Sequence, residues 1–224
     1  EIENNSKCFN KGKLSSYFLR GFYPNESAMY VNNSFIDKKL HKFGSELKIS
    51  FMSNLMEDKG IVEFIESAIS LREENDTKIE VFIAGAIIEN SSERLKTALK
   101  KATDKSYINF LGLVDGKEKW ELLSKTDIFI LPTYYKTEAL PLSLIEAMRF
   151  GCLCISSNIG EINELLKDDR GIIIDKVNTK NLLDTIKLAI KDDESSKSKM
   201  INSFKYADKN FSYNVYKDNL KDII

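Results

Sequence analysis

The sequence predicts a doubly wound α/β fold, in which helices cover both faces of a parallel sheet. From about residue 46 to residue 192, short and almost solid runs of Ile, Phe, Leu and Val alternate with longer amphipathic segments. Strands that are apolar on both sides are typical of parallel sheets buried beneath helices. The chain has 224 residues, 42% of them hydrophobic, which is enough to bury a core of this kind without disulfides or metals.

The individual elements follow from local patterns. Strands are expected at residues 47–54, 78–85, 106–112, 127–132, 152–157 and 171–175. Helices are expected between and after them, at residues 59–74, 91–102, 118–125, 142–151, 160–167 and 178–193. A serine opens the second of these helices as an expected N-cap, and a glycine at the end of the fourth suits the residue that follows a helix.

The two ends of the chain depart from this rhythm. Residues 1–45 are polar and turn-rich, with one possible strand at residues 28–33, and we expect a linker or the tail of another unit there. The charge-rich residues 191–199 are expected to form a turn between helices, and residues 193–224 to form closing helices.

Bulk composition excludes several classes of function. The formal net charge is −1 and Lys and Arg are spread along the chain, so no basic field for nucleic acid is expected. No apolar run is long enough to span a membrane, and the N-terminus lacks the apolar core of a signal peptide. The sequence begins with Glu rather than Met, which suggests a processed or trimmed chain.

The few cysteines and the single histidine argue against several kinds of catalytic and metal site. An odd, sparse set of three cysteines indicates a reducing compartment, and we interpret Cys152 and Cys154 as small strand residues rather than a metal pair. The single histidine, His41, lies in a polar stretch and is expected at the surface, which argues against hydrolase triads and His-rich metal sites. No D-x-D pair, Walker loop or G-x-G-x-x-G occurs. No metal or cofactor is therefore expected.

One stretch, TYYKTEALPLSLIEAM at residues 133–148, carries the expected chemistry. We place Pro141 in the first turn of the helix, where its fixed φ and missing N–H are tolerated. The backbone amides of Leu140, Leu142 and Ser143 would then face the carboxyl end of the preceding strand. Free amides at the positive end of a helix dipole form an anion site.

Two glutamates, Glu138 and Glu146, flank this helix start in an E-x7-E spacing. Glu146 is expected at the border of an apolar stripe that includes Leu142, and Glu138 in the turn at the rim. A carboxylate can accept both hydroxyls of a vicinal diol, so the pair suits a nucleotide-sugar, which has hydroxyls on both sides of a diphosphate. On spacing alone, two ordinary surface glutamates remain an open alternative.

The order of several motifs resembles that of a known family. TEALPLSLIEAMRFG, followed by SNIGEINELL and GIIID, is similar to the C-terminal half of retaining glycosyltransferases of the GT-B architecture, family 4 or group 1. SNLMEDKG at 53–60 resembles the family's first strand-to-helix loop, INFLGLVD at 108–115 its strand before the base-binding loop, and FSYNVYKDNL its closing helix. The resemblance covers about residues 46–192, and implies a Rossmann-like nucleotide-sugar-binding domain there.

The resemblance also implies roles for single residues. Glu138 would accept hydroxyls of the donor sugar, and Glu146 those of the ribose. The amides around Leu140 and Leu142 would bind the diphosphate, and Lys59 would neutralise it. A lysine at a helix start opposes the helix dipole unless an anion lies there, which supports this role for Lys59.

Three further positions belong to the implied donor site. Val114 would lie near the base. Asn54 stands where the family often has Arg, which removes a guanidinium from the phosphates. Pro141 stands where the family often has Gly, which removes one amide donor.

The implied reaction moves a sugar, of hexose type, from a nucleotide-diphosphate donor to an acceptor hydroxyl with retention. Lys59 and the helix amides would stabilise the leaving diphosphate, and Glu138 would orient the sugar, without a metal. In this family a carbohydrate or lipid-linked acceptor binds an N-terminal domain, of which residues 1–45 would be only the end, with residues 29–37 resembling its last strand and linker. The chain alone is therefore expected to be inactive.

The resemblance further implies a polysaccharide pathway and a cytoplasmic location, with peripheral attachment to the inner membrane face as an option. Two alternatives stay open at this point. One is a sugar-nucleotide hydrolase or epimerase on the same architecture, which needs further acid–base groups. The other is a non-catalytic α/β interaction module, in which the glutamates have no ligand.

Overall fold

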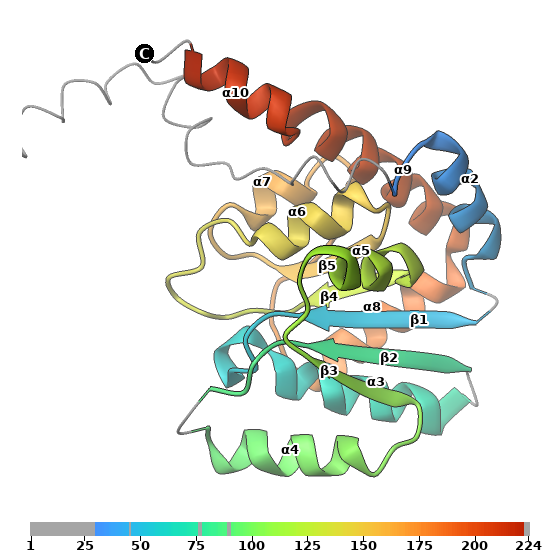
Figure 1. Cartoon of the computed structure of the whole chain (residues 1–224). Helices are drawn as coiled ribbons and strands as arrows, with labels where there is room; N and C mark the ends of the chain where they lie inside the picture. Colours follow the sequence, from blue (N-terminus) through green and yellow to red (C-terminus); the bar gives the residue numbers. More distant parts are fainter. Residues whose placement is uncertain (1–29, 45, 76–77, 89–90, 222–224) are drawn as a thin grey trace, which may run out of the picture.

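A single parallel sheet with helices on both faces organises the computed structural model, which describes residues 30–44, 46–75, 78–88 and 91–221 (Figure 1). The sheet order is β3-β2-β1-β4-β5-β6, and every neighbouring pair is parallel. The strands are β1 Leu47–Met52, β2 Ile79–Ala84, β3 Ile108–Gly112, β4 Ile128–Leu131, β5 Leu153–Ser157 and β6 Ile172–Ile174. The predicted doubly wound α/β fold is confirmed.

The helices lie where the amphipathic segments predicted them, with two additions. They are α2 Asn33–Lys42, the 3-10 turn η3 Glu57–Lys59, α3 Ile61–Asn75, α4 Glu93–Thr103, α5 Gly116–Lys125, α6 Leu142–Arg149, α7 Ile162–Leu166, α8 Thr179–Lys191, α9 Asp193–Asn210 and α10 Tyr213–Lys221. Figure 1 shows α3 and α4 on one face of the sheet and α5 and α6 on the other. The additions are α2 and the short turn η3.

The buried strands explain the solid apolar runs. All residues of β4 and β5 are buried, because these strands lie inside the sheet and are covered on both faces. β3 is an edge strand, and its residues Phe110 and Leu111 stay more than one third exposed. The core therefore follows the centre of the sheet, where β1 and β4 are neighbours.

The N-terminal part differs from its prediction. A strand at residues 28–33 is wrong where the structure describes it, since residues 30–32 form no strand and helix α2 begins at Asn33. The Oδ1 atom of Asn32 accepts a hydrogen bond from the amide of Phe35 at 2.9 Å, which caps the helix. Residues 1–29 of that segment lie outside the described residues.

Helix α2 packs on the same core as the sheet. Ile36 is buried, and the ring of Phe35 meets that of Phe150 edge-on at 6.4 Å between centroids. The buried Lys39 donates from Nζ to the carbonyl oxygens of Leu123 at 3.1 Å and Phe150 at 2.8 Å. The boundary expected at residue 46 is therefore not a boundary of packing, because the helix before it fills the core.

The expected turn at residues 191–199 is also wrong. Only Asp192 separates α8 from α9, and its Oδ1 atom accepts a hydrogen bond from the amide of Ser195 at 3.2 Å as an N-cap. The charge-rich sequence forms the first two turns of α9, with Ser196 and Met200 buried. The composition resembled a turn because the exposed face of this helix is strongly charged.

Among the described residues, no helix combines the length and the apolar character that crossing a membrane requires. This agrees with the expectation from the sequence.

Candidate functional site

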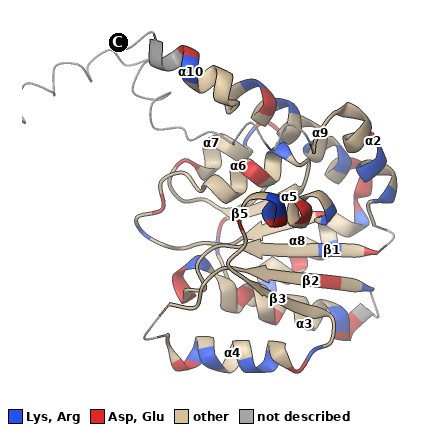
Figure 2. Ribbon diagram, viewed as in Figure 1, with Lys and Arg blue, Asp and Glu red and all other residues tan. Residues whose placement is uncertain are grey.

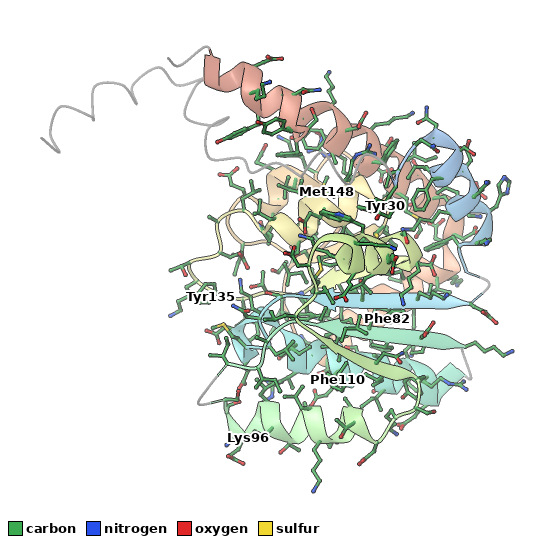
Figure 3. The ribbon with its side chains drawn as sticks, viewed as in Figure 1. Tyr30, Phe82, Lys96, Phe110, Tyr135 and Met148 are labelled. Carbon is green, nitrogen blue, oxygen red and sulfur yellow. The ribbon has the colours of Figure 1, made fainter. Side chains whose placement is uncertain are left out.

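The sheet order reverses between β1 and β4, so the chain leaves these neighbouring strands in opposite directions. In open α/β sheets, ligands bind outside the carboxyl ends of the strands at such a point. The loops after the two strands meet there, since the amide of Tyr134 donates to the carbonyl oxygen of Asp58 at 2.8 Å. Figure 3 shows Tyr135 in the loop beyond the strand ends.

Glycines allow these loops to approach one another. Gly60, between η3 and α3, has a φ of 76°, and a Cβ atom there would lie 2.1 Å from the carbonyl oxygen of Pro132. Gly160, after β5, has a φ of 54°, and a Cβ atom there would lie 2.2 Å from the carbonyl oxygen of Glu138. The loop that carries Glu138 is thus held between two backbone neighbours.

Lys59 and Glu138, predicted to act on one donor molecule, form an ion pair at this point. Lys59 Nζ lies 2.6 Å from Glu138 Oε2, and the two side chains are only 14% and 9% exposed. The ammonium also lies 4.7 Å from the centroid of the Tyr135 ring. The anion expected beside Lys59 is therefore supplied in part by Glu138 of the same chain, so the position of Lys59 alone does not indicate a ligand.

Glu146 forms a second ion pair, with a residue that the sequence analysis missed. Its Oε1 atom lies 2.8 Å from Nζ of Lys119 on α5, with side chains 9% and 18% exposed, respectively. Burial raises the pKa of Glu146, while Lys119 opposes the rise and the nearby carboxylate of Asp115 adds to it. Lys119 lies near the start of its helix, against the dipole, which is the signal that could have found it.

Helix α6 begins at Leu142, as expected, but Pro141 precedes its first turn instead of lying in it. Pro141 has φ −71° and ψ 114° and is the N-cap, so Leu142 is the first helical residue. The proline carbonyl oxygen accepts the amide of Leu144 at 3.1 Å. Within the described residues, the amides of Leu140, Leu142 and Ser143 donate no hydrogen bond. The three predicted amides are therefore available to an anion.

The side chain of Leu142 corrects another expectation. It is 52% exposed, so it does not belong to the buried stripe of α6. Leu144, Ile145 and Met148 are fully buried, as expected, and Figure 3 labels Met148 on this helix over the sheet.

Asn54 and Val114 lie in loops at the same edge of the sheet. Asn54 follows β1 and is exposed, and Val114 follows β3 and is half-buried against the core. Within the described residues, the side chain of Asn54 forms no hydrogen bond with either ion pair. Their proposed contacts with donor phosphates and base stay predictions.

The described residues contain no group of three or more His, Cys, Asp or Glu side chains placed to hold a metal. Cys152 and Cys154 are free and buried. Cys154 lies in β5, as interpreted from the sequence, whereas Cys152 directly precedes this strand. His41 is exposed. The expectation that no metal takes part stays a prediction.

Solved structures of other proteins share this fold. The C-terminal domain of a glycosyl transferase group 1 family protein from Francisella tularensis matches with a TM-score of 0.66, at 20% identity, over 86% of this chain and 96% of that chain. Anabaena HepE, in complex with UDP and glucose, matches with a TM-score of 0.69, at 18% identity, over 90% of this chain and 55% of that one. The fold is that of the C-terminal domains of GT-B glycosyltransferases.

Residues 32–207 match the family described as glycosyl transferases group 1, and the chain belongs to this family. A relative in Campylobacter jejuni, N,N'-diacetylbacillosaminyl-diphospho-undecaprenol alpha-1,3-N-acetylgalactosaminyltransferase, is 26% identical over 79% of this chain and 43% of its own length. Phosphatidyl-myo-inositol mannosyltransferase of Propionibacterium freudenreichii is 25% identical over 58% of this chain and 30% of its own length. The chain therefore spans less than half the length of either relative.

Proposed function

We propose that this chain is the donor-binding half of a retaining glycosyltransferase of hexosyl type. The observation that carries the proposal is the meeting of Lys59 and Glu138 beside the free amides of the α6 start, at the point where the sheet order reverses. A cation, an acid and a helix N-terminus at one strand edge suit a sugar joined to a diphosphate.

The diphosphate binds between Lys59 and the amides of Leu140, Leu142 and Ser143. The ammonium turns from Glu138 towards the phosphates, and Glu138 then accepts hydrogen bonds from hydroxyls of the donor sugar. As the sugar departs, negative charge develops on the leaving diphosphate, and these fixed donors stabilise it. No metal or cofactor is required for this step.

Glu146 accepts the two ribose hydroxyls. A buried carboxylate binds a diol well only when it is ionised, and Lys119 favours its ionised form. Asn54 faces the phosphates and Val114 the base. Asn54 and Pro141 stand where the family often has Arg and Gly, so a guanidinium and one amide donor are missing. Binding of the diphosphate therefore depends more strongly on Lys59.

The acceptor is a carbohydrate or a lipid-linked molecule, and it binds a further domain. Both relatives carry a lipid-linked molecule in their names, a diphospho-undecaprenol and a phosphatidyl-myo-inositol. Such an acceptor would place the whole protein at the cytoplasmic face of a membrane, in a pathway that builds surface polysaccharide. Without that domain, the chain binds the donor but completes no transfer.

A thermal-shift series with UDP, GDP and ADP tests donor binding, since a ligand that binds only the folded state raises its melting temperature. At least one nucleotide should stabilise the chain. The shift should disappear in Lys59→Ala and Glu146→Ala, but persist in Glu138→Gln, because a free nucleotide lacks the sugar that Glu138 binds. Lys136→Ala, an exposed lysine in the same loop, is the matched control.

Two results would contradict the proposal. No stabilisation by any of the three nucleotides would favour a non-catalytic interaction module. Release of nucleotide from a nucleotide-sugar without an acceptor would favour a hydrolase on the same fold.

A further inference from the structure

A hollow lies at the amino ends of the strands, opposite the candidate donor site. It has a volume of about 600 Å³ and is bounded by α2, the end of α5 and the starts of β1 and β4. Figure 2 shows basic residues on α2, above the start of β1. We call this hollow the amino-edge groove.

The lining of the amino-edge groove is strongly basic. It contains five lysines and two carboxylates, Lys38, Lys39, Lys42, Lys48 and Lys125 against Glu46 and Asp127. The whole chain has a net charge of −1, so this excess of positive charge is local. Like charges gathered in one hollow repel each other unless an anion lies between them.

Asp127 faces part of this charge, since burial raises the pKa of its carboxyl and the positive charges of Lys39 and Lys48 oppose that rise. Within the described residues, Lys38, Lys39 and Lys125 form no ion pair with a carboxylate, and Lys48 lies 3.8 Å from the half-exposed Glu80. Asp127 is engaged by the backbone, since its Oδ2 atom accepts the amide of Lys48 at 2.8 Å.

Local structure accounts for part of this cluster only. Three of the lysines lie in the last turns of α2 and α5, where the negative end of the helix dipole stabilises a cation. They are Lys39, Lys42 and Lys125. Lys39 is also fixed by carbonyl oxygens from two other segments. Lys38 lies before the last turn and Lys48 lies on a strand, so neither is explained in this way.

We infer that the amino-edge groove binds a phosphate-bearing ligand. Lysine ammoniums are point charges that suit phosphate oxygens from several directions. The volume is larger than a phosphate ion needs and falls in the usual range for small organic ligands. The half-buried ring of Phe35 adds an apolar wall, so the ligand carries an organic part.

The groove lies at the amino ends of the strands, whereas Lys59 and Glu146 lie beyond their carboxyl ends. The two sites can be occupied together, and the inference does not rest on the proposed donor binding. The phosphate can belong to a soluble metabolite or to a lipid headgroup, and the experiment separates these sources.

The test titrates the full chain with inorganic pyrophosphate by calorimetry, and measures its sedimentation with phosphatidylglycerol vesicles and with phosphatidylcholine vesicles. The groove variant is Lys38→Glu with Lys125→Glu, two exposed positions. Its matched control is Lys100→Glu with Lys101→Glu, which reverses the same charge on the exposed side of α4. Pyrophosphate titrations are done in a Lys59→Ala background, so that the donor site does not contribute.

The groove variant should lose affinity by about tenfold or more, while the control pair loses much less, because charge-assisted contacts are short-ranged. Loss confined to pyrophosphate indicates a soluble ligand, and loss confined to phosphatidylglycerol vesicles a lipid headgroup. No binding of either probe, or equal loss in the two variants, overturns the inference. Stabilisation by nucleotides should be unchanged in the groove variant, so failure of the groove and failure of donor binding are separate results.

Discussion

At the residue scale, the candidate site consists of two nearly buried lysine–glutamate pairs on either side of one helix start. Lys59 pairs with Glu138 and Lys119 with Glu146. Removing one partner of such a pair leaves a buried charge without compensation, which costs more than the pair itself contributes. Each acid can therefore change partner, from a lysine to ligand hydroxyls, only if the lysine keeps another anion nearby.

The role of Lys119 can be tested through the pH dependence of nucleotide binding. In Lys119→Met, Glu146 keeps its burial but loses its cation, so its pKa should rise further. Because the ribose hydroxyls need the ionised acid, affinity for a stabilising nucleotide should fall in the variant, and the deficit should grow as the pH is lowered from about 8 to 5.

Lys117→Met is the control for that experiment, since Lys117 is exposed on the same helix. Its pH profile should follow that of the unmodified chain. A Lys119→Met profile that runs parallel to both would show that Lys119 does not act through the ionisation of Glu146.

The raised pKa of Glu146 also predicts how stability changes with pH. Above its ordinary value of 4.5 the unfolded chain loses this proton while the folded chain keeps it, so the folded state binds more protons. The stability of the unmodified chain relative to Glu146→Gln should therefore fall as the pH rises above 4.5, and level off above the folded pKa. Urea unfolding of both proteins over this range measures the difference, and a rising difference would contradict it.

At the scale of elements, the site depends on the connection between β1 and α3. Arg94 of α4 bridges Glu57 at 2.9 Å and Glu63 at 2.9 Å, and Ser92 donates a hydrogen bond to Glu57. This network joins η3, α3 and α4, and the loop that holds Lys59 is fixed by it. A neighbouring helix thus supports the position of Lys59 without contacting Glu138.

Alanine substitutions at two glycines with similar backbone conformations distinguish two costs to stability. One is the strain of a left-handed backbone, and the other is crowding of the added Cβ atom. Gly112→Ala, at φ 67° with open space around it, should cost about 1 kcal/mol for the left-handed conformation alone. Gly60→Ala, at φ 76° and directed at the carbonyl oxygen of Pro132, should cost at least about 1 kcal/mol more, because the loops must separate. Denaturant unfolding measures both, and equal losses would show that the two loops do not pack as described.

Gly60→Ala should also weaken nucleotide stabilisation, since it moves the turn that carries Lys59. Gly44→Ala, at φ 88° with open space around it and away from the donor site, serves as its control in the same thermal-shift series. A nucleotide shift retained in full by Gly60→Ala would argue against the role of Lys59.

At the scale of the whole molecule, α2 and the sheet share one core, so they should unfold together. The single tryptophan, Trp120, is 3% exposed and stacks on Phe150 at 5.7 Å, and Phe150 also meets Phe35 of α2. Tryptophan fluorescence therefore reports on the contact between α2, α5 and the segment that follows α6.

Ile36→Ala should lower the stability of the whole domain by about 2 to 5 kcal/mol, because it leaves a cavity between α2 and the core. Fluorescence and far-UV circular dichroism should still give one coincident transition. Ser34→Ala, on the exposed side of α2, should change the stability by less than about 0.5 kcal/mol. A separate early transition in Ile36→Ala would instead make α2 an appended segment, as the expected boundary at residue 46 implied.

Most elements were predictable because their signals are local. Solid apolar runs and period-3.6 patterns, together with a serine cap, placed the six strands and the helices of the sheet region within a few residues. The failures are also local in origin. Helix α2 was missed because its apolar residues are few, so its sequence shows only a weak helical pattern. The start of α9 was predicted as a turn because one face of that helix is charged.

Local sequence patterns are enough to predict that a parallel sheet forms, and that Lys59, Glu138, Glu146 and a helix start follow its strands. Which of these side chains meet depends on how the strands and helices pack. Lys59 and Glu138 are 79 positions apart, and they pair because β1 and β4 are neighbours in the sheet. Strand order is set by long-range packing, which local sequence patterns do not report. Glu146 and Lys119 likewise join α6 to α5, so the sequence could mark Lys119 as unusual but could not give its partner.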